Sequence, residues 1–191
     1  EVMAARNDAV IVGIPNAGER RMLEYCPWPN QFTDEVAGHR YVEDLIGTVV
    51  PFVEATLPVR NDRADRGTMG SSLGGLISLY AFLERPEWFG FVGSMSTAAW
   101  WTPEIWPYLA AVEVPEGRLY LDVGTEEMPG DPVMSEAYLD SFHRLRRWAR
   151  ASLPAGHVMA VEDEGAIHHE SAWARRLPTA LDFLLPPQPG P

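Results

Sequence analysis

The sequence predicts an α/β fold, with a mostly parallel sheet covered by helices on both faces. Short apolar runs alternate with longer segments of helical periodicity along the whole length of the chain. The runs are continuously apolar, which is typical of strands buried on both faces of a sheet. Because no linker or internal repeat divides the chain, we expect one domain over residues 1–185 and a Pro-rich tail over 186–191.

Five runs are expected to form the sheet. The first, at 9–14, ends at Pro15 and has the pattern of a strand buried on both faces. The others lie at 67–70, 89–95, 118–123 and 157–161. Ligands bind beyond the carboxyl ends of the strands in such sheets, so the loops that follow these runs should line the site.

Helical spacing occurs between the runs. Apolar residues over 42–53 recur with this spacing after helix-start signals at 33–35, and Pro51 should kink or split the helix. Further helices are expected at 73–83, 103–110, 134–153 and 171–185, with loops at 15–31 and 60–66.

Composition excludes several chemistries. The 191 residues include no lysine, and 15 arginines stand against 27 acidic residues, for a formal net charge of −12. A Schiff-base lysine and a Walker-type phosphate loop are therefore excluded. The acidic balance argues against a nucleic-acid partner. Hydrolysis or group transfer would have to use Ser, His, Asp, Glu, Arg or Cys side chains.

The single cysteine, Cys26, excludes a disulfide within the chain. The apolar runs are too short to span a bilayer. Neither feature decides the cellular compartment, although we favour the cytoplasm. The chain could also form a homo-oligomer.

The segment from Gly70 to Gly74 reads Gly-Ser-Ser-Leu-Gly and matches the pattern G-x-S-x-G between an expected strand and an expected helix. In so tight a turn both glycines should pass close to neighbouring backbone, and Ser72 should be strained with its hydroxyl facing outward. The N–H of Leu73, at the helix N-terminus, can stabilise an oxyanion. Ser71 is a rival nucleophile one position from the motif centre, and a merely flexible turn is the alternative interpretation.

A serine nucleophile needs a base, and histidine is the usual one. His168 and His169 follow the final strand, where hydrolases of this architecture place the histidine after the acid. The other three histidines lie inside expected helices or at a strand start and are expected to be structural: His39, His143 and His157. The segment 168–170 lacks His-Glu-x-x-His spacing, so we expect neither a metal site nor a cofactor.

The third member of such a triad should follow the run at 118–123. Glu126 and Glu127 lie in the following loop, and Asp131 lies slightly beyond. A carboxylate there would hold the histidine tautomer and stabilise the imidazolium. A pair of solvated loop acids is the alternative interpretation.

Four stretches together resemble the Putative esterase family of α/β-hydrolases, which includes enterochelin esterases, feruloyl esterases, S-formylglutathione hydrolase and the mycolyltransferases. They are Val10–Asn16 with Arg20, Glu24 and Tyr25; Gly70–Gly75; Leu121–Glu127; and Gly165–Glu170 with Trp173. The resemblance implies an α/β-hydrolase fold with Ser72 as nucleophile, His168 as base and Glu127 as acid. Many members carry Asp at the acid position, so Glu127 departs mildly from the family pattern.

Members of this family usually carry a further strand and loop ahead of the segment that matches Val10. That loop supplies a second oxyanion-hole N–H, and nothing in this sequence matches it. The resemblance therefore implies a chain that lacks N-terminal strands, and we expect weak activity or none.

Substrate contacts are expected from two loops. Trp100 and Trp101 lie in the loop after the run at 89–95, at the edge of the sheet where the catalytic residues are expected. They could form one wall of a pocket for the acyl group, or simply pack under their loop. Arg20 and Tyr25 could contact a polar substrate end, although Arg20 could equally pair with Glu24.

The expected function is hydrolysis of a small-molecule carboxylic ester through an acyl-enzyme. The alternatives are acyl transfer to an alcohol by the same triad, and a non-catalytic binding domain.

Overall fold

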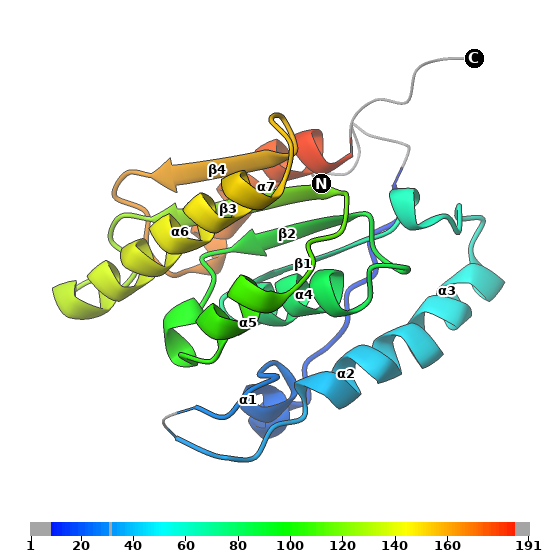
Figure 1. The fold of residues 1–191 in the computed structure, drawn as a ribbon, viewed down its shortest axis with the longest axis horizontal. Helices are drawn as coiled ribbons and strands as arrows, with labels where there is room; N and C mark the ends of the chain where they lie inside the picture. Colours follow the sequence, from blue (N-terminus) through cyan, green and yellow to red (C-terminus); the bar gives the residue numbers. More distant parts are fainter. Residues whose placement is uncertain (1–8, 31, 186–191) are drawn as a thin grey trace.

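The computed structural model describes residues 9–30 and 32–185 (Figure 1). Its sheet has four parallel strands in the order β1-β2-β3-β4. They are β1 (Gly67–Ser71), β2 (Phe91–Met95), β3 (Arg118–Gly124) and β4 (Val158–Asp163). Gly67 pairs with Phe91, Phe91 with Arg118, and Leu119 with Val158. The four predicted runs from 67 onward are thus confirmed, and their carboxyl ends meet at one edge.

Seven α-helices accompany the described strands. They are α1 (Arg21–Glu24), α2 (Gly38–Asp44), α3 (Val50–Thr56), α4 (Leu73–Glu84), α5 (Ile105–Ala111), α6 (Pro132–Ser152) and α7 (Glu170–Leu184). The helices predicted at 73–83, 103–110, 134–153 and 171–185 are confirmed within two residues at each end. The predicted loops contain short helical turns, since η2 (Gly18–Arg20) and α1 lie within 15–31 and η4 (Arg63–Asp65) lies within 60–66.

The helices cover both faces of the sheet, as predicted (Figure 1). Side chains alternate across the sheet along β3, so Leu119 and Leu121 join the core formed with α4 and α6. Tyr120 faces the other way and packs with Ala180 and Leu184 of α7. This arrangement confirms the predicted α/β-hydrolase architecture.

The predicted long helix contains a π-helical turn. It begins at Gly38 rather than near residue 33, because Asn30 and Thr33 pair across a tight turn just before it. The π-helical turn Leu45–Val49 joins α2 to α3 just before Pro51, and the segment 38–56 is helical without a break. Proline has no N–H to donate and disturbs the preceding turn, so Pro51 alters the helix as expected but does not split it.

The strand predicted at 9–14 is wrong. This segment has no regular structure, and Val10, Ile11 and Val12 are 51%, 54% and 42% exposed. Residues 9–14 pair with none of the described strands, although the outer edge of β1 is open. An apolar run becomes a strand only when another strand satisfies its N–H and C=O groups.

The turn between β1 and α4 has the predicted strain. Ser72 adopts φ 60° and ψ −126°, a region that costs a side-chain-bearing residue energy. A Cβ on Gly70 would lie 2.5 Å from the backbone of Gly74, which confirms the predicted close approach there. The Gly74 backbone is the other side of this close approach, but a Cβ on Gly74 would point away from it and meet only Tyr25, at 4.0 Å.

Of the helices within 9–30 and 32–185, none combines the length and the apolar character needed to cross a membrane.

Gly70 and Gly74, the two glycines of the turn around Ser72, should respond differently to substitution, because only Gly70 lacks room for a Cβ. Gly70→Ala forces backbone apart and is expected to lower the free energy of unfolding by roughly 1–3 kcal/mol. Gly74→Ala gains helix propensity and should leave stability unchanged or raise it by up to about 1 kcal/mol. Urea denaturation of both variants checks this, and equal destabilisation by the two would contradict the assigned geometry.

Candidate active site

Three loops at the carboxyl edge of the sheet carry the predicted triad. Ser72 lies in the turn after β1, Glu127 lies in the loop after β3, and His168 lies in the loop after β4. Parallel strands bring these loops to one edge, because every strand ends on the same side.

Glu127 and His168 are in direct contact. The Nδ1 atom of His168 lies 2.6 Å from Oε2 of Glu127, and the backbone N–H of His168 donates to the Glu127 carbonyl at 2.8 Å. The Glu127 side chain is fully buried, whereas that of His168 is 16% exposed. The carboxylate therefore holds the proton on Nδ1 and leaves Nε2 free to exchange protons.

The other carboxylate oxygen of Glu127 is also satisfied. Its Oε1 accepts hydrogen bonds from the backbone N–H of Gly124 and from the Ser96 hydroxyl, both at 2.6 Å. The rival acids lie elsewhere: Glu126 is exposed, and Asp131 caps α6 by accepting from the N–H of Met134 at 3.0 Å. Of the three acids that the sequence offered, the structure brings only Glu127 to His168.

Ser96 links the triad acid to a buried arginine. Its hydroxyl accepts hydrogen bonds from Nη2 of Arg176 at 2.8 Å and from the indole of Trp173 at 3.0 Å, while it donates to Glu127. Ser96 itself is buried and has φ 40°. Arg176 also pairs with Asp122 at 2.9 Å. This network holds the Glu127 carboxylate through its Oε1 atom, while Oε2 faces His168.

Buried charges in this network balance one another. Burial raises the pKa of Asp122, and the Arg176 guanidinium opposes that rise. Burial works to lower the pKa of Arg176, but Asp122 and its other acidic neighbours raise it overall. Burial would likewise raise the pKa of Asp163, but its bonds to Arg175 and Arg176 hold it below the usual range. A charged Arg176 is the centre of the cluster.

The imidazole of His168 lies between two aromatic rings. Tyr138 of α6 lies on one side, with ring centroids 4.8 Å apart, and Trp173 of α7 meets it edge-on at 4.9 Å. The Tyr138 hydroxyl is 3.5 Å from Nε2 of His168, at the long end of hydrogen-bond distance. Trp173 therefore packs α7 against the histidine.

Ser72 is half-buried at the turn, and Leu73 is the first residue of α4. The N–H of Leu73 has no acceptor one turn earlier in the helix, which leaves it available to an oxyanion. Burial raises the pKa of Tyr138. Among the described residues, Tyr138 rather than Ser72 lies within hydrogen-bond distance of Nε2 of His168.

An aromatic row runs from this centre to the surface. Trp100 meets Tyr138 at 5.5 Å, Trp101 meets Trp100 at 5.6 Å, and Phe32 lies over Trp101 at 4.6 Å. Phe32 is 66% exposed. The predicted pair Trp100 and Trp101 thus lies beside the predicted triad, and no sequence pattern indicated that Phe32 would extend the row.

The other predicted substrate contacts differ in position. Tyr25 is buried beside Gly74 at the start of α4, and Arg21 stacks over its ring at 5.3 Å. The side chain of Arg20 makes no described hydrogen bond or ion pair, including none with Glu24. Arg21, rather than Arg20, is the arginine with a described contact near the site.

The remaining histidines have structural partners, as predicted for His39, His143 and His157. His169 caps α7, His143 lies 3.1 Å from Glu162, His157 lies 2.9 Å from the carbonyl of Gly117, and His39 contacts the Tyr80 hydroxyl. Over the part of the chain that the structure describes, no three His, Cys, Asp or Glu side chains gather as a metal site would require.

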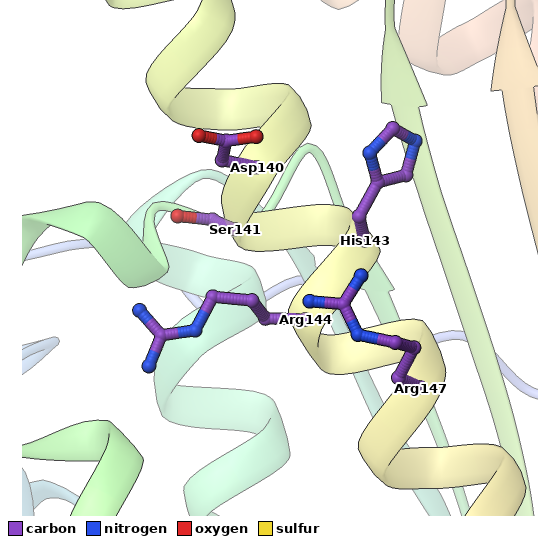
Figure 2. A pocket seen from close by; sticks show the side chains of 5 residues that line it. All are labelled: Asp140, Ser141, His143, Arg144 and Arg147. Atoms are coloured by element: carbon purple, nitrogen blue, oxygen red, sulfur yellow. The ribbon is translucent and has the colours of Figure 1, made fainter.

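A hollow of about 270 Å³ lies on α6 (Figure 2), and none of the three predicted triad residues lines it. It is lined by Asp140, Ser141, His143, Arg144 and Arg147. Arg144 is engaged with the ring of Trp106 at 3.6 Å. All the lining residues come from one stretch of one helix and include both signs of charge, so the hollow has no evident ligand chemistry.

Known proteins are similar to this chain in sequence. Uncharacterized protein YbbA of Bacillus subtilis is 27% identical over 185 residues, covering 93% of this chain and 73% of that protein. Iron(III) salmochelin esterase of Escherichia coli is 33% identical over 96 residues, covering 49% of this chain and 21% of that protein.

Solved structures show the same fold. The enterobactin esterase FES from Shigella flexneri matches with a TM-score of 0.63 and 25% identity, covering 78% of this chain and 39% of that one. The siderophore hydrolase EstA from Aspergillus nidulans matches with a TM-score of 0.66 and 18% identity, covering 86% and 65%. This chain therefore spans less than two thirds of either structure. The family model described as Putative esterase matches residues 2–184, and the chain belongs to that family.

Proposed function

We propose that this protein is a serine carboxylic ester hydrolase in which Ser72, His168 and Glu127 form the triad. The observation that carries the proposal is the buried Glu127 carboxylate, 2.6 Å from Nδ1 of His168. It lies at the same sheet edge as a strained Ser72 in a strand–turn–helix context. Membership of the Putative esterase family supports the same class of reaction.

The geometry supports a two-step mechanism. Ser72 Oγ attacks the ester carbonyl carbon while Nε2 of His168 takes its proton, and Glu127 stabilises the imidazolium. The N–H of Leu73 donates to the oxyanion, helped by the N-terminal end of the α4 dipole. The C–O bond to the alcohol then breaks, and His168 returns the proton to the departing oxygen. Water hydrolyses the acyl-enzyme by the same steps in reverse order.

The aromatic row supports an ester that carries a planar ring. Phe32, Trp101 and Trp100 offer ring faces and edges from the surface to the triad. The Shigella flexneri enterobactin esterase was solved in the presence of 2,3-di-hydroxy-N-benzoyl-glycine, which contains such a ring. We place the ring of the substrate along Trp100 and Trp101, with Tyr25 and an arginine, Arg20 or Arg21, toward its polar end.

Ser72→Ala should abolish labelling by a fluorophosphonate probe and hydrolysis of p-nitrophenyl acetate, because the probe reacts only with an activated serine. Ser71→Ala is the matched control, since it removes the neighbouring hydroxyl, and it should keep both activities. In-gel fluorescence and absorbance at the nitrophenolate band measure them. Labelling that persists in Ser72→Ala would refute the assignment of the nucleophile.

Glu127→Gln should lower kcat by roughly 10⁴-fold with little change in KM. Three donors face the carboxylate, from Gly124, Ser96 and His168, so an amide NH₂ must oppose one of them or turn the histidine to the wrong tautomer. Glu126→Gln, at the exposed neighbour, should match the parent protein. Steady-state kinetics of the two variants decide between them, and a larger loss from Glu126→Gln would assign the acid there instead.

Phe32→Ala should lower kcat/KM for a p-nitrophenyl benzoate by severalfold, roughly the 0.5–1.5 kcal/mol of an aromatic pair, and leave the acetate unchanged. Phe52→Ala is the control, because Phe52 is equally exposed, at 67%, but lies on α3. The ratio of the two ester rates is the measurement. A ratio unaffected by Phe32→Ala would remove Phe32 from the substrate path.

A further inference from the structure

One buried hydroxyl in the site has no part in the mechanism above. Tyr138 lies on α6 with 4% of its surface exposed, and its ring packs between Trp100 and His168. Its oxygen is 3.5 Å from Nε2 of His168. Because Glu127 occupies Nδ1, Nε2 is the nitrogen that must exchange protons with Ser72, with the departing alcohol and with the attacking water. The Tyr138 hydroxyl therefore lies where those oxygen atoms must come.

The Tyr138 oxygen has room for a donor. Among the described residues its only hydrogen-bond contact is with Nε2 of His168, at 3.5 Å. Its lone pairs are therefore available to the attacking water at the stage when that water must bind.

We propose that the Tyr138 oxygen is the second acceptor for the attacking water, and that it favours water over alcohols as the acyl acceptor. The proposal rests on the proposed esterase function. Water donates one hydrogen to Nε2 of His168 and the other to Tyr138 Oη, which aims its lone pair at the acyl carbonyl. As the O–C bond forms, the first hydrogen moves to Nε2 as a proton and then to Ser72 Oγ, whose bond to the acyl carbon breaks. The second hydrogen stays on the carboxylic acid product.

An alcohol has only one hydroxyl hydrogen. It can donate to Nε2 but leaves Tyr138 Oη without a donor, and an unsatisfied buried acceptor is costly. The same triad therefore hydrolyses an acyl-enzyme more readily than it transfers the acyl group to an alcohol, and the bias comes from Tyr138.

The test is Tyr138→Phe in the presence of added methanol. A p-nitrophenyl ester forms the acyl-enzyme, and chromatography measures the ratio of methyl ester to free acid. Tyr138→Phe should raise this ratio roughly three- to tenfold, the worth of one hydrogen bond. It should also slow steady-state turnover more than the initial burst of p-nitrophenolate, because deacylation is the affected step.

Tyr108→Phe is the matched control. It removes a hydroxyl that donates to Glu84 at 2.8 Å on α4, away from the triad, and should give the parent ratio. The ratio reports only on molecules that have been acylated, so a partly unfolded variant cannot imitate the effect. A parent-like ratio in Tyr138→Phe, with burst and turnover reduced equally, would overturn the role of Tyr138 while leaving the esterase function intact. A parent protein with neither burst nor fluorophosphonate labelling would overturn both.

Discussion

The hydrogen bonds of one buried carboxylate organise this site. An isolated carboxylate out of water is very costly, so Glu127 can be buried only if each oxygen has partners. Those partners are Gly124 at the end of β3, Ser96 after β2, and His168 after β4. A shift in register between any two of these strands would leave the charge unsatisfied. The position of the histidine is therefore coupled to the pairing of the whole sheet.

The chain contains no lysine, and an arginine, Arg176, is the cation that pairs with Asp122 and Asp163. Its planar guanidinium contacts the Ser96 hydroxyl, the Asp122 carboxylate and the Asp163 carboxylate at once, from different directions. A lysine ammonium concentrates its charge at one atom and could not span this set. Arginine thus neutralises the buried acids and, through Ser96, supports the Glu127 carboxylate without touching it.

The sequence predicted well what depends on near neighbours in the chain. The turn at Ser72, the four paired strands and the long helices follow from local pattern and turn chemistry. The strand at 9–14 was predicted wrongly because burial requires a neighbouring strand, which periodicity cannot supply. Ser96 and Tyr138 were missed because their importance lies in contacts across the fold. The spacing of Tyr138 on its helix resembles that of any core residue.

The free outer edge of β1, within the described residues, affects the proposed nucleophile, Ser72, most. Ser72 is held in a strained conformation by a strand that is five residues long, half-buried throughout and paired on one side. Glu127 instead follows β3, which has a neighbour on each side and a buried interior. Fraying and amide hydrogen exchange should begin at β1. The molecule would then lose the strained conformation of Ser72 on warming while Glu127 and its supporting cluster were still folded.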